Sequence, residues 1–183
     1  GFAEFAASVE TELKAEAGAD RGRLGAELAT HLLTVAEIET LVRSYRFKQA
    51  AEEYERLLQS VASAARRAEI EARLPEVRGM AGALTKLVAS VNRAGGKTKV
   101  KIGKTELALA KADDTSFDFT IPGGNGRFLW ACLDTSIFCA LALETAPSPD
   151  ETLGLACLAW DAGERALALK LFEEAAKKKP ALR

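Results

Sequence analysis

The sequence predicts an α+β protein, made mostly of α-helical hairpins with an inserted four-stranded antiparallel β-meander. Apolar residues recur at helical spacing through residues 1–94 and again through residues 134–183. Between them, in residues 95–133, the apolar period shortens to two, and turn-forming residues separate four short runs. We therefore expect a helical region, a β-meander and a set of C-terminal helices, which together form one compact unit of 183 residues.

Four helical apolar faces precede the predicted sheet. The second helix either runs to about Tyr45 or breaks near Thr34. In the fourth, Pro75 has no backbone N–H to donate, so we expect a kink or a new helix start there. Gly95 and Gly96 then end the last helix, because glycine favours the left-handed conformation that closes a helix. The four faces lie at residues 2–13, 24–42, 47–61 and 65–91.

Four strands joined by short turns make up the predicted sheet. We place turns at Gly103-Lys104, at Asp113-Asp114 and in the glycine-rich segment 122–126. Alternate residues of a strand point to the same face, so the large apolar side chains share one face that the helices must cover. Those side chains are Val100, Ile102, Leu107, Leu109, Phe117, Phe119, Ile121, Phe128 and Trp130.

Three helices are expected after the sheet. Asp134 or Thr135 caps a short first helix. Ser148 and Glu151 have the spacing of a capping box, in which each side chain satisfies a free backbone N–H at the helix start. The helix that begins there is separated from the last one near Gly163.

The C-terminal hairpin resembles a tetratricopeptide repeat. Gly163 stands at its turn, Ala168, Phe172 and Ala175 stand where the two helices touch, and Pro180 ends it. The resemblance implies a helix-turn-helix unit that packs on neighbouring helices and offers a concave face to a partner's peptide or helix. A weaker echo of the motif lies in residues 46–61, at Ala50, Tyr54 and Leu57.

A second resemblance concerns the order of the elements. A helical hairpin, a small meander that ends in Trp130 and a short helix, and a second hairpin are similar to accessory regions of large bacterial multidomain proteins, some of which carry kinase domains. With the opening Gly1-Phe2 in place of a methionine, this leads us to expect a fragment of a larger bacterial protein.

Cysteine usage and hydropathy favour a cytoplasmic protein that does not enter a membrane. Cys132, Cys139 and Cys157 are odd in number and lie in apolar surroundings, so we expect buried free thiols of a reducing compartment. No signal peptide is visible, and the longest apolar stretch, Ile137–Leu143, is too short to span a bilayer.

No catalytic, cofactor or metal site is expected, and we predict a protein that is not an enzyme. His31 is the single histidine, and its helical setting is typical of a packed or helix-edge side chain. Gly96-Lys97-Thr98 ends like a phosphate-binding loop, but Val91 replaces the required first glycine and a strand follows instead of a helix. A carboxylate-based enzyme stays open in principle, although the three clustered carboxylates are better explained as turn residues; they are Asp113, Asp114 and Asp118.

A local excess of lysine is the most suggestive feature. Residues 95–112 carry five lysines and one glutamate, although the whole chain has a net charge of −1. Alternate lysines line one side of the first predicted strand, where they either protect an exposed sheet edge or contact phosphates or an acidic protein. We call them the lysine strip: Lys97, Lys99, Lys101 and, just beyond, Lys104.

These observations favour a non-enzymatic protein-interaction or scaffolding module. The alternative is a phosphate- or nucleic-acid-contacting module that uses the lysine strip. We expect Trp130 and Trp160 to be core anchors or anchors between elements, whereas an exposed tryptophan in a groove would indicate peptide binding. Trp160 therefore joins the lysine strip as a candidate interaction residue. The identity of the partner and the oligomeric state stay open.

Overall fold

The computed structural model describes residue 25 and residues 28–179. The chain divides between Glu37 and Ile38 into two units. Residues 28–43 are helical without the break considered near Thr34, and His31 is buried, as expected of a packed side chain. The predicted helix over residues 2–13 and the terminating Pro180 lie outside the described residues.

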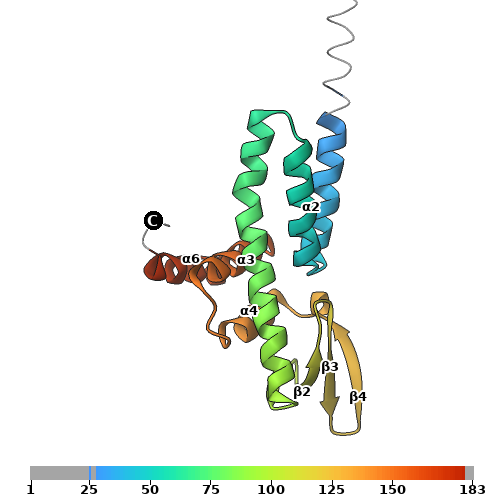
Figure 1. Cartoon of the computed structure of the whole chain (residues 1–183). Coiled ribbons are helices and arrows are strands. Elements are labelled where there is room, and N and C mark those ends of the chain that lie inside the picture. The colour runs from blue at the N-terminus through green and yellow to red at the C-terminus, as the bar shows by residue number, and fades with distance from the viewer. Residues whose placement is uncertain (1–24, 26–27, 180–183) are drawn as a thin grey trace, which may run out of the picture. The chain divides into compact units, whose positions relative to one another are not determined.

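A helical hairpin precedes the sheet in the second unit. It consists of α2 (Phe47–Ser60) and the long α3 (Ala64–Ala94), which lie side by side in Figure 1. The expected new start at Pro75 is wrong, because α3 is a single helix through this residue. Proline removes one backbone hydrogen bond, and buried side chains on both sides of it, such as Leu74 and Val77, hold the helix in the core. Gly95 ends α3 with a φ of 57°, as predicted.

The four-stranded antiparallel meander is confirmed. Its strands are β1 (Thr98–Ile102), β2 (Thr105–Ala112), β3 (Ser116–Ile121) and β4 (Gly124–Leu129), and they are arranged in that order. The third turn is shorter than the predicted 122–126. It consists of Pro122 and Gly123 alone, and Gly123 has a φ of 112°. Gly126 belongs to β4, where a methyl group would lie 2.6 Å from the ring of Phe119.

One face of the sheet packs on α3, as its apolar pattern predicts. Leu107, Leu109 and Phe117 are buried on that face, and β2 makes the main contact with α3. Figure 1 shows the sheet beside the C-terminal part of α3. The opposite face carries the polar residues of the alternation, including Lys99 and Lys101.

Three helices and one turn of 3-10 helix follow the sheet. They are η1 (Trp130–Cys132), α4 (Thr135–Leu143), α5 (Pro149–Asp161) and α6 (Arg165–Lys178). The predicted capping box between Ser148 and Glu151 is present at the start of α5. Asp134 occupies the N-cap position of α4, but its side chain makes no capping hydrogen bond.

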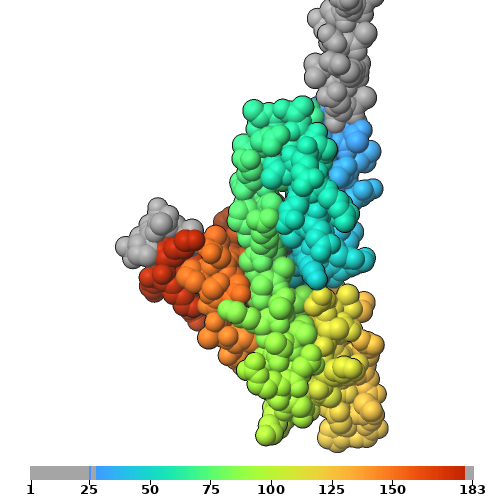
Figure 2. Space-filling view, viewed as in Figure 1, coloured from blue at the N-terminus to red at the C-terminus, as the bar shows by residue number. Residues whose placement is uncertain are grey.

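The helices that precede the sheet in the sequence and those that follow it share one hydrophobic core with the sheet. Phe47 of α2, Met80 of α3 and Leu109 of β2 belong to the same buried cluster as Phe138 of α4 and Leu155 of α5. The contact between α3 and α5 depends on two glycines, because a methyl group on Gly154 would lie 2.6 Å from the carbonyl carbon of Gly79. Figures 1 and 2 place the α5–α6 hairpin and the sheet on opposite sides of α3.

Candidate functional site

Trp160 lies at the end of α5 and is 42% exposed, so of its two predicted roles, core anchor or anchor between elements, the first is wrong. Trp130, in contrast, is fully buried as expected. The guanidinium of Arg165 lies 4.0 Å from the centre of the Trp160 ring, and the ring of Phe172 meets that ring edge-on at 6.4 Å. The stacked cation and the neighbouring ring restrain the indole while leaving part of it exposed.

A cavity of about 390 Å³ opens beside this indole, between α3, α5 and α6. We call it the Trp160 groove. Leu153, Cys157 and Phe172 give it an apolar lining, to which the indole contributes. The other lining residues are charged and come from α3 and the end of α5: Arg73, Glu76 and Asp161.

The charged side of the groove belongs to an ion-pair network centred on Arg73. Arg73 donates two hydrogen bonds to the carboxylate of Glu39, each 3.0 Å long. It also donates to Glu76 at 2.7 Å and to Asp161 at 2.6 Å, while the Tyr54 hydroxyl donates to Glu39 at 2.6 Å. These residues, the Arg73 cluster, join residues 38–43 to α2, α3 and α5, so they fix the elements around the groove.

Titration within the Arg73 cluster is shifted away from neutral pH. Desolvation acts to raise the pKa of Glu39, but the hydrogen bonds from Arg73 and Tyr54 outweigh it and leave that pKa below 4.5. Burial and the bond to Glu39 raise the pKa of the Tyr54 hydroxyl above 10.0. Glu39 is therefore charged and Tyr54 neutral at pH 7, which suits a structural clamp better than acid–base chemistry.

The lysine strip lies on an edge strand, apart from Trp160. Lys99 and Lys101 are exposed on β1, Lys97 comes directly before that strand and Lys104 lies in the turn after it. Lys99 pairs with Glu106 of β2 at 2.7 Å. The structure thus brings the four lysines to one sheet edge. The α5–α6 hairpin, which lines the Trp160 groove, and the sheet lie on opposite sides of α3 (Figure 1).

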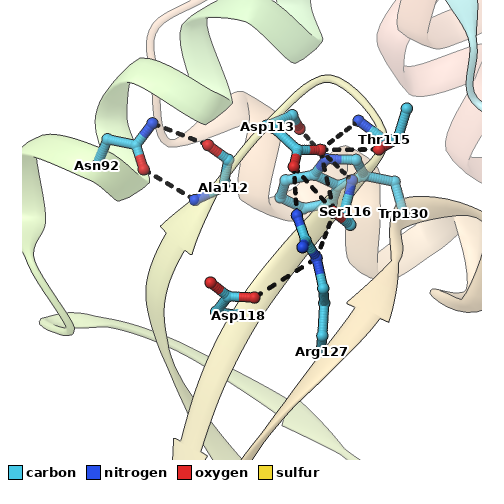
Figure 3. Close-up of polar contacts among 8 residues, drawn as sticks. All are labelled: Asn92, Ala112, Asp113, Thr115, Ser116, Asp118, Arg127 and Trp130. Carbon is cyan, nitrogen blue, oxygen red and sulfur yellow. Dashed lines mark hydrogen bonds and ion pairs between the residues drawn. The ribbon is translucent and has the colours of Figure 1, made fainter.

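Asp113 holds together the turn between β2 and β3 (Figure 3). Its carboxylate accepts hydrogen bonds from the backbone N–H and hydroxyl of both Thr115 and Ser116, and it pairs with Arg127. The backbone carbonyl of Asp113 accepts a 2.8 Å hydrogen bond from the indole of Trp130. Desolvation opposes ionisation, yet the hydrogen bonds prevail and hold the pKa of Asp113 well below 3.8. This aspartate is a turn residue, as predicted.

The cysteines differ from the prediction in one case. Cys139 and Cys157 are buried, and burial raises the pKa of each thiol to about 12. Cys132 is exposed, because it lies in the short η1 helix, which buries only Trp130. Within the described residues no group of histidine, cysteine or carboxylate side chains is arranged to hold a metal ion.

No family model, curated protein or solved structure matches the chain. Among the described helices, none combines the length and the apolar content that crossing a membrane requires. The likeness of the last hairpin to a tetratricopeptide repeat stays a prediction. Sequence reasoning missed the Arg73 cluster, for which the only local signal is the spacing of three between Arg73 and Glu76.

Proposed function

We propose that the protein is a non-enzymatic interaction module that binds a partner protein's peptide or helix in the Trp160 groove. The observation that carries this proposal is the partly exposed Trp160 ring, restrained by Arg165 beside an apolar cavity. A partly exposed tryptophan leaves a large apolar surface in contact with water. A partner side chain that covers this surface removes it from water, and that burial contributes to the free energy of binding.

The groove is built in advance of binding. The Arg73 cluster holds α3 and α5 together, and Arg165 restrains the indole, so little side-chain freedom is lost when a ligand enters. Tryptophan and arginine are the residue types that dominate binding energy at protein interfaces. The cavity takes one or two apolar side chains, while its charged rim favours a ligand that stays partly exposed.

Selection from a library of random 15-residue peptides tests this function. Peptides enriched on the wild-type protein are expected to bind the Trp160→Ala variant at least about tenfold more weakly, since truncating a central tryptophan typically costs more than 1.4 kcal/mol. The Lys99→Ala, Lys101→Ala double variant is the control and should bind as the wild type does. Far-ultraviolet circular dichroism confirms that each variant is folded. Equal binding to Trp160→Ala, or no enrichment at all, contradicts the proposal.

A second candidate function is contact with phosphates through the lysine strip. It is favoured by Lys97, Lys101 and Lys104, which make no ion pair with any residue in the described part of the chain. Against it, Lys99 is neutralised by Glu106, and an edge strand lined with lysine is a common protection against unwanted strand pairing. The strip also lacks aromatic side chains on which single-stranded bases could stack.

Salt dependence tests this second function. Binding of a fluorescein-labelled 20-base-pair DNA duplex should weaken steeply as salt rises, because each lysine that contacts a phosphate releases a counterion. The Lys99→Glu, Lys101→Glu double variant should bind at least about tenfold more weakly at low salt. No binding at low salt, or binding that salt does not change, contradicts this function and leaves the Trp160 groove untouched.

A further inference from the structure

The two edges of the sheet differ in how well they are protected against pairing with another strand. Strands β1 and β4 are the outer strands of the four, and β4 lies on the side away from α3 in Figure 1. The edge at β1 carries the lysine strip, which disfavours pairing with another strand. The edge at β4 contains no lysine and includes two exposed apolar residues, Phe128 (39% exposed) and Leu129 (55% exposed).

The backbone of β4 presents unpaired hydrogen-bonding groups along its outer edge. The N–H of Trp130 donates to the carbonyl of Thr115 at 3.0 Å, which identifies this opposed pair as a hydrogen-bonded one. Hydrogen-bonded and non-hydrogen-bonded pairs alternate along an antiparallel ladder. In the register of β3 and β4, the N–H and carbonyl groups of Leu129, Arg127 and Asn125 therefore point away from β3. Among the described residues, no other backbone group pairs with these three.

The one charged side chain of β4 does not guard this edge. Arg127 is directed back over β3, where its Nε donates to the hydroxyl of Ser116 at 2.8 Å and lies 3.5 Å from the carboxylate of Asp118. Its other end pairs with Asp113 (Figure 3). A charge that projected beyond the edge would repel an incoming strand, but here the guanidinium is held over the sheet.

A second copy of the chain is a poor occupant of the edge. Two-fold pairing centred on Arg127 would place two guanidinium groups opposite each other. Pairing centred on Phe128 would match only residues 127–129 of each copy, and pairing centred on Gly126 would match residues 124–128 and leave Leu129 beside the turn, whereas a stable protein interface buries about 1,200 Å² or more. An extended segment of another polypeptide avoids both difficulties, because it can follow all six residues of β4.

The side chains around β4 define the chemistry of that segment. On the face turned toward α3, Phe128 stacks on Phe119 with ring centres 4.8 Å apart, so apolar side chains suit the partner's positions on that face. Near the Leu129 end, three carboxylates outnumber two cations, which are Arg127 and the Lys111 that lies opposite Asp118 in β2, and this favours a basic over an acidic segment. The carboxylates are those of Asp113 and Asp118, which lie beside Arg127 in Figure 3, and of Asp114, which follows Asp113 in the turn.

We propose that β4 is a docking site for an extended segment of another protein, which adds a fifth strand to the sheet. The segment carries apolar side chains on the Phe128 face and a basic residue at the end that lies near Leu129. Its residues opposite Asn125, Arg127 and Leu129 exchange backbone hydrogen bonds with them. This site is independent of the Trp160 groove, since the sheet and the α5–α6 hairpin lie on opposite sides of α3 (Figure 1).

The probe for this site is the synthetic peptide Lys-Val-Thr-Val-Thr-Val-Lys, blocked at both ends. With valines on the Phe128 face, the threonine N–H groups point to β4 and the valine N–H groups point away from it. N-methylation of both threonines should weaken binding at least about tenfold, whereas N-methylation of the valines should leave binding within about twofold. The same peptide with glutamate in place of both lysines should also bind more weakly.

Two variants at one position give the matching test on the protein. Leu129 has a φ of −75°, which proline adopts without strain, so Leu129→Pro removes one outward N–H and keeps the strand. Its control, Leu129→Ala, loses the same exposed side chain but keeps the N–H. Leu129→Pro should bind the peptide at least about fivefold more weakly than Leu129→Ala does, because a backbone hydrogen bond is lost. Urea unfolding confirms that both variants are folded.

Amide chemical shifts locate the bound peptide. Changes concentrated at Asn125, Arg127 and Leu129 support the proposal. The proposal is overturned if the unmodified peptide has a Kd above about 1 mM, or if the two patterns of N-methylation reduce its affinity equally. It is also overturned if the chemical-shift changes are centred on Trp160 or the lysine strip. The last outcome would assign the peptide to one of the other two surfaces.

Discussion

The side-chain amide of Asn92 takes the place of a neighbouring strand at the end of β2. Its Nδ2 donates to the carbonyl of Ala112 at 2.9 Å, and the N–H of Ala112 donates to its Oδ1 at 2.8 Å (Figure 3). The pairing of β1 with β2 reaches only as far as Thr98 and Leu109, so Ala112 has no partner on that side. Asn92 thus satisfies both of its backbone groups and joins α3 to the sheet.

Replacing Asn92 should therefore weaken the fold measurably. Asn92→Ala loses two hydrogen bonds, and we expect the free energy of unfolding to fall by about 1–2 kcal/mol, because water replaces part of what is lost at this partly buried site. Asn92→Asp keeps the acceptor but loses the donor, and it places a carboxylate against the Ala112 carbonyl. It should therefore be no more stable than Asn92→Ala. Urea unfolding followed by circular dichroism measures both.

Asn125 offers a matched control for these variants. It is an exposed asparagine in β4 whose side chain makes no hydrogen bond with any residue in the described part of the chain. Asn125→Ala should unfold within about 0.5 kcal/mol of the wild type. A result in which Asn92→Ala and Asn125→Ala have the same midpoint would show that the paired amide contributes nothing to stability.

The crossing of α3 and α5 should be intolerant of any side chain at Gly154. A methyl group there would lie 2.6 Å from the Gly79 carbonyl carbon and 2.8 Å from the carbonyl oxygen of Glu76. Both neighbours are backbone atoms of a buried helix, so the two helices must separate. We expect Gly154→Ala to lower the free energy of unfolding by about 3 kcal/mol, as measured by thermal and urea unfolding.

Gly82 of the same helix is the natural comparison. The three atoms nearest to a methyl group at Gly82 all belong to the side chain of Glu151, the first of them at 3.0 Å, and none belongs to a backbone. Alanine also favours a helix over glycine by about 1 kcal/mol, which offsets the crowding. Gly82→Ala should therefore be close to neutral. If it were as damaging as Gly154→Ala, helix separation would not be the cause of the effect.

Acid should weaken the protein through Glu39. The pKa of this group is lower in the folded chain than its ordinary value of 4.5, so its contribution is complete above pH 4.5 and is lost as the pH falls toward the folded pKa. Glu39→Gln removes that contribution. The variant should be less stable than the wild type at pH 7, and the gap between them should narrow as the pH falls below 4.5. Urea midpoints measured across this range provide the test.

Glu52 serves as the control for the acid experiment. It is an exposed glutamate of α2 for which the described residues provide no ion pair. Glu52→Gln should unfold within about 0.5 kcal/mol of the wild type at pH 7. A gap between Glu39→Gln and the wild type that stays constant, or widens, as the pH falls would contradict the role given to the Arg73 cluster.

Local chemistry predicted the parts of this fold that depend on neighbouring residues. Gly95 ends α3, and Ser148 with Glu151 begins α5, because helix ends are closed by groups a few residues away. No new helix starts at Pro75, because the packing of Leu74 and other buried side chains outweighs one missing hydrogen bond. Local rules fail where the outcome depends on tertiary packing.

In the candidate sites, too, features set by neighbouring residues were predicted and features set by tertiary packing were not. The lysine strip follows from strand alternation, and its position at a sheet edge agrees with the prediction. The exposure of Trp160 does not follow from helical periodicity, because it depends on how closely α3 and α6 flank the end of α5. The Arg73 cluster draws on four elements, and Arg73 and Asp161 are 88 residues apart, so no local pattern reveals it.

The three cysteines should differ sharply in reactivity. Cys132 is exposed, whereas burial raises the pKa of Cys139 and Cys157 to about 12, which leaves little reactive thiolate at pH 8. Iodoacetamide added to the folded protein should therefore modify Cys132 alone, as read from tryptic peptides by mass spectrometry. In 6 M guanidinium chloride all three thiols should react at similar rates. Rapid labelling of Cys157 in the folded protein would mean that the Trp160 groove opens far enough for iodoacetamide to reach this thiol, which belongs to the apolar lining.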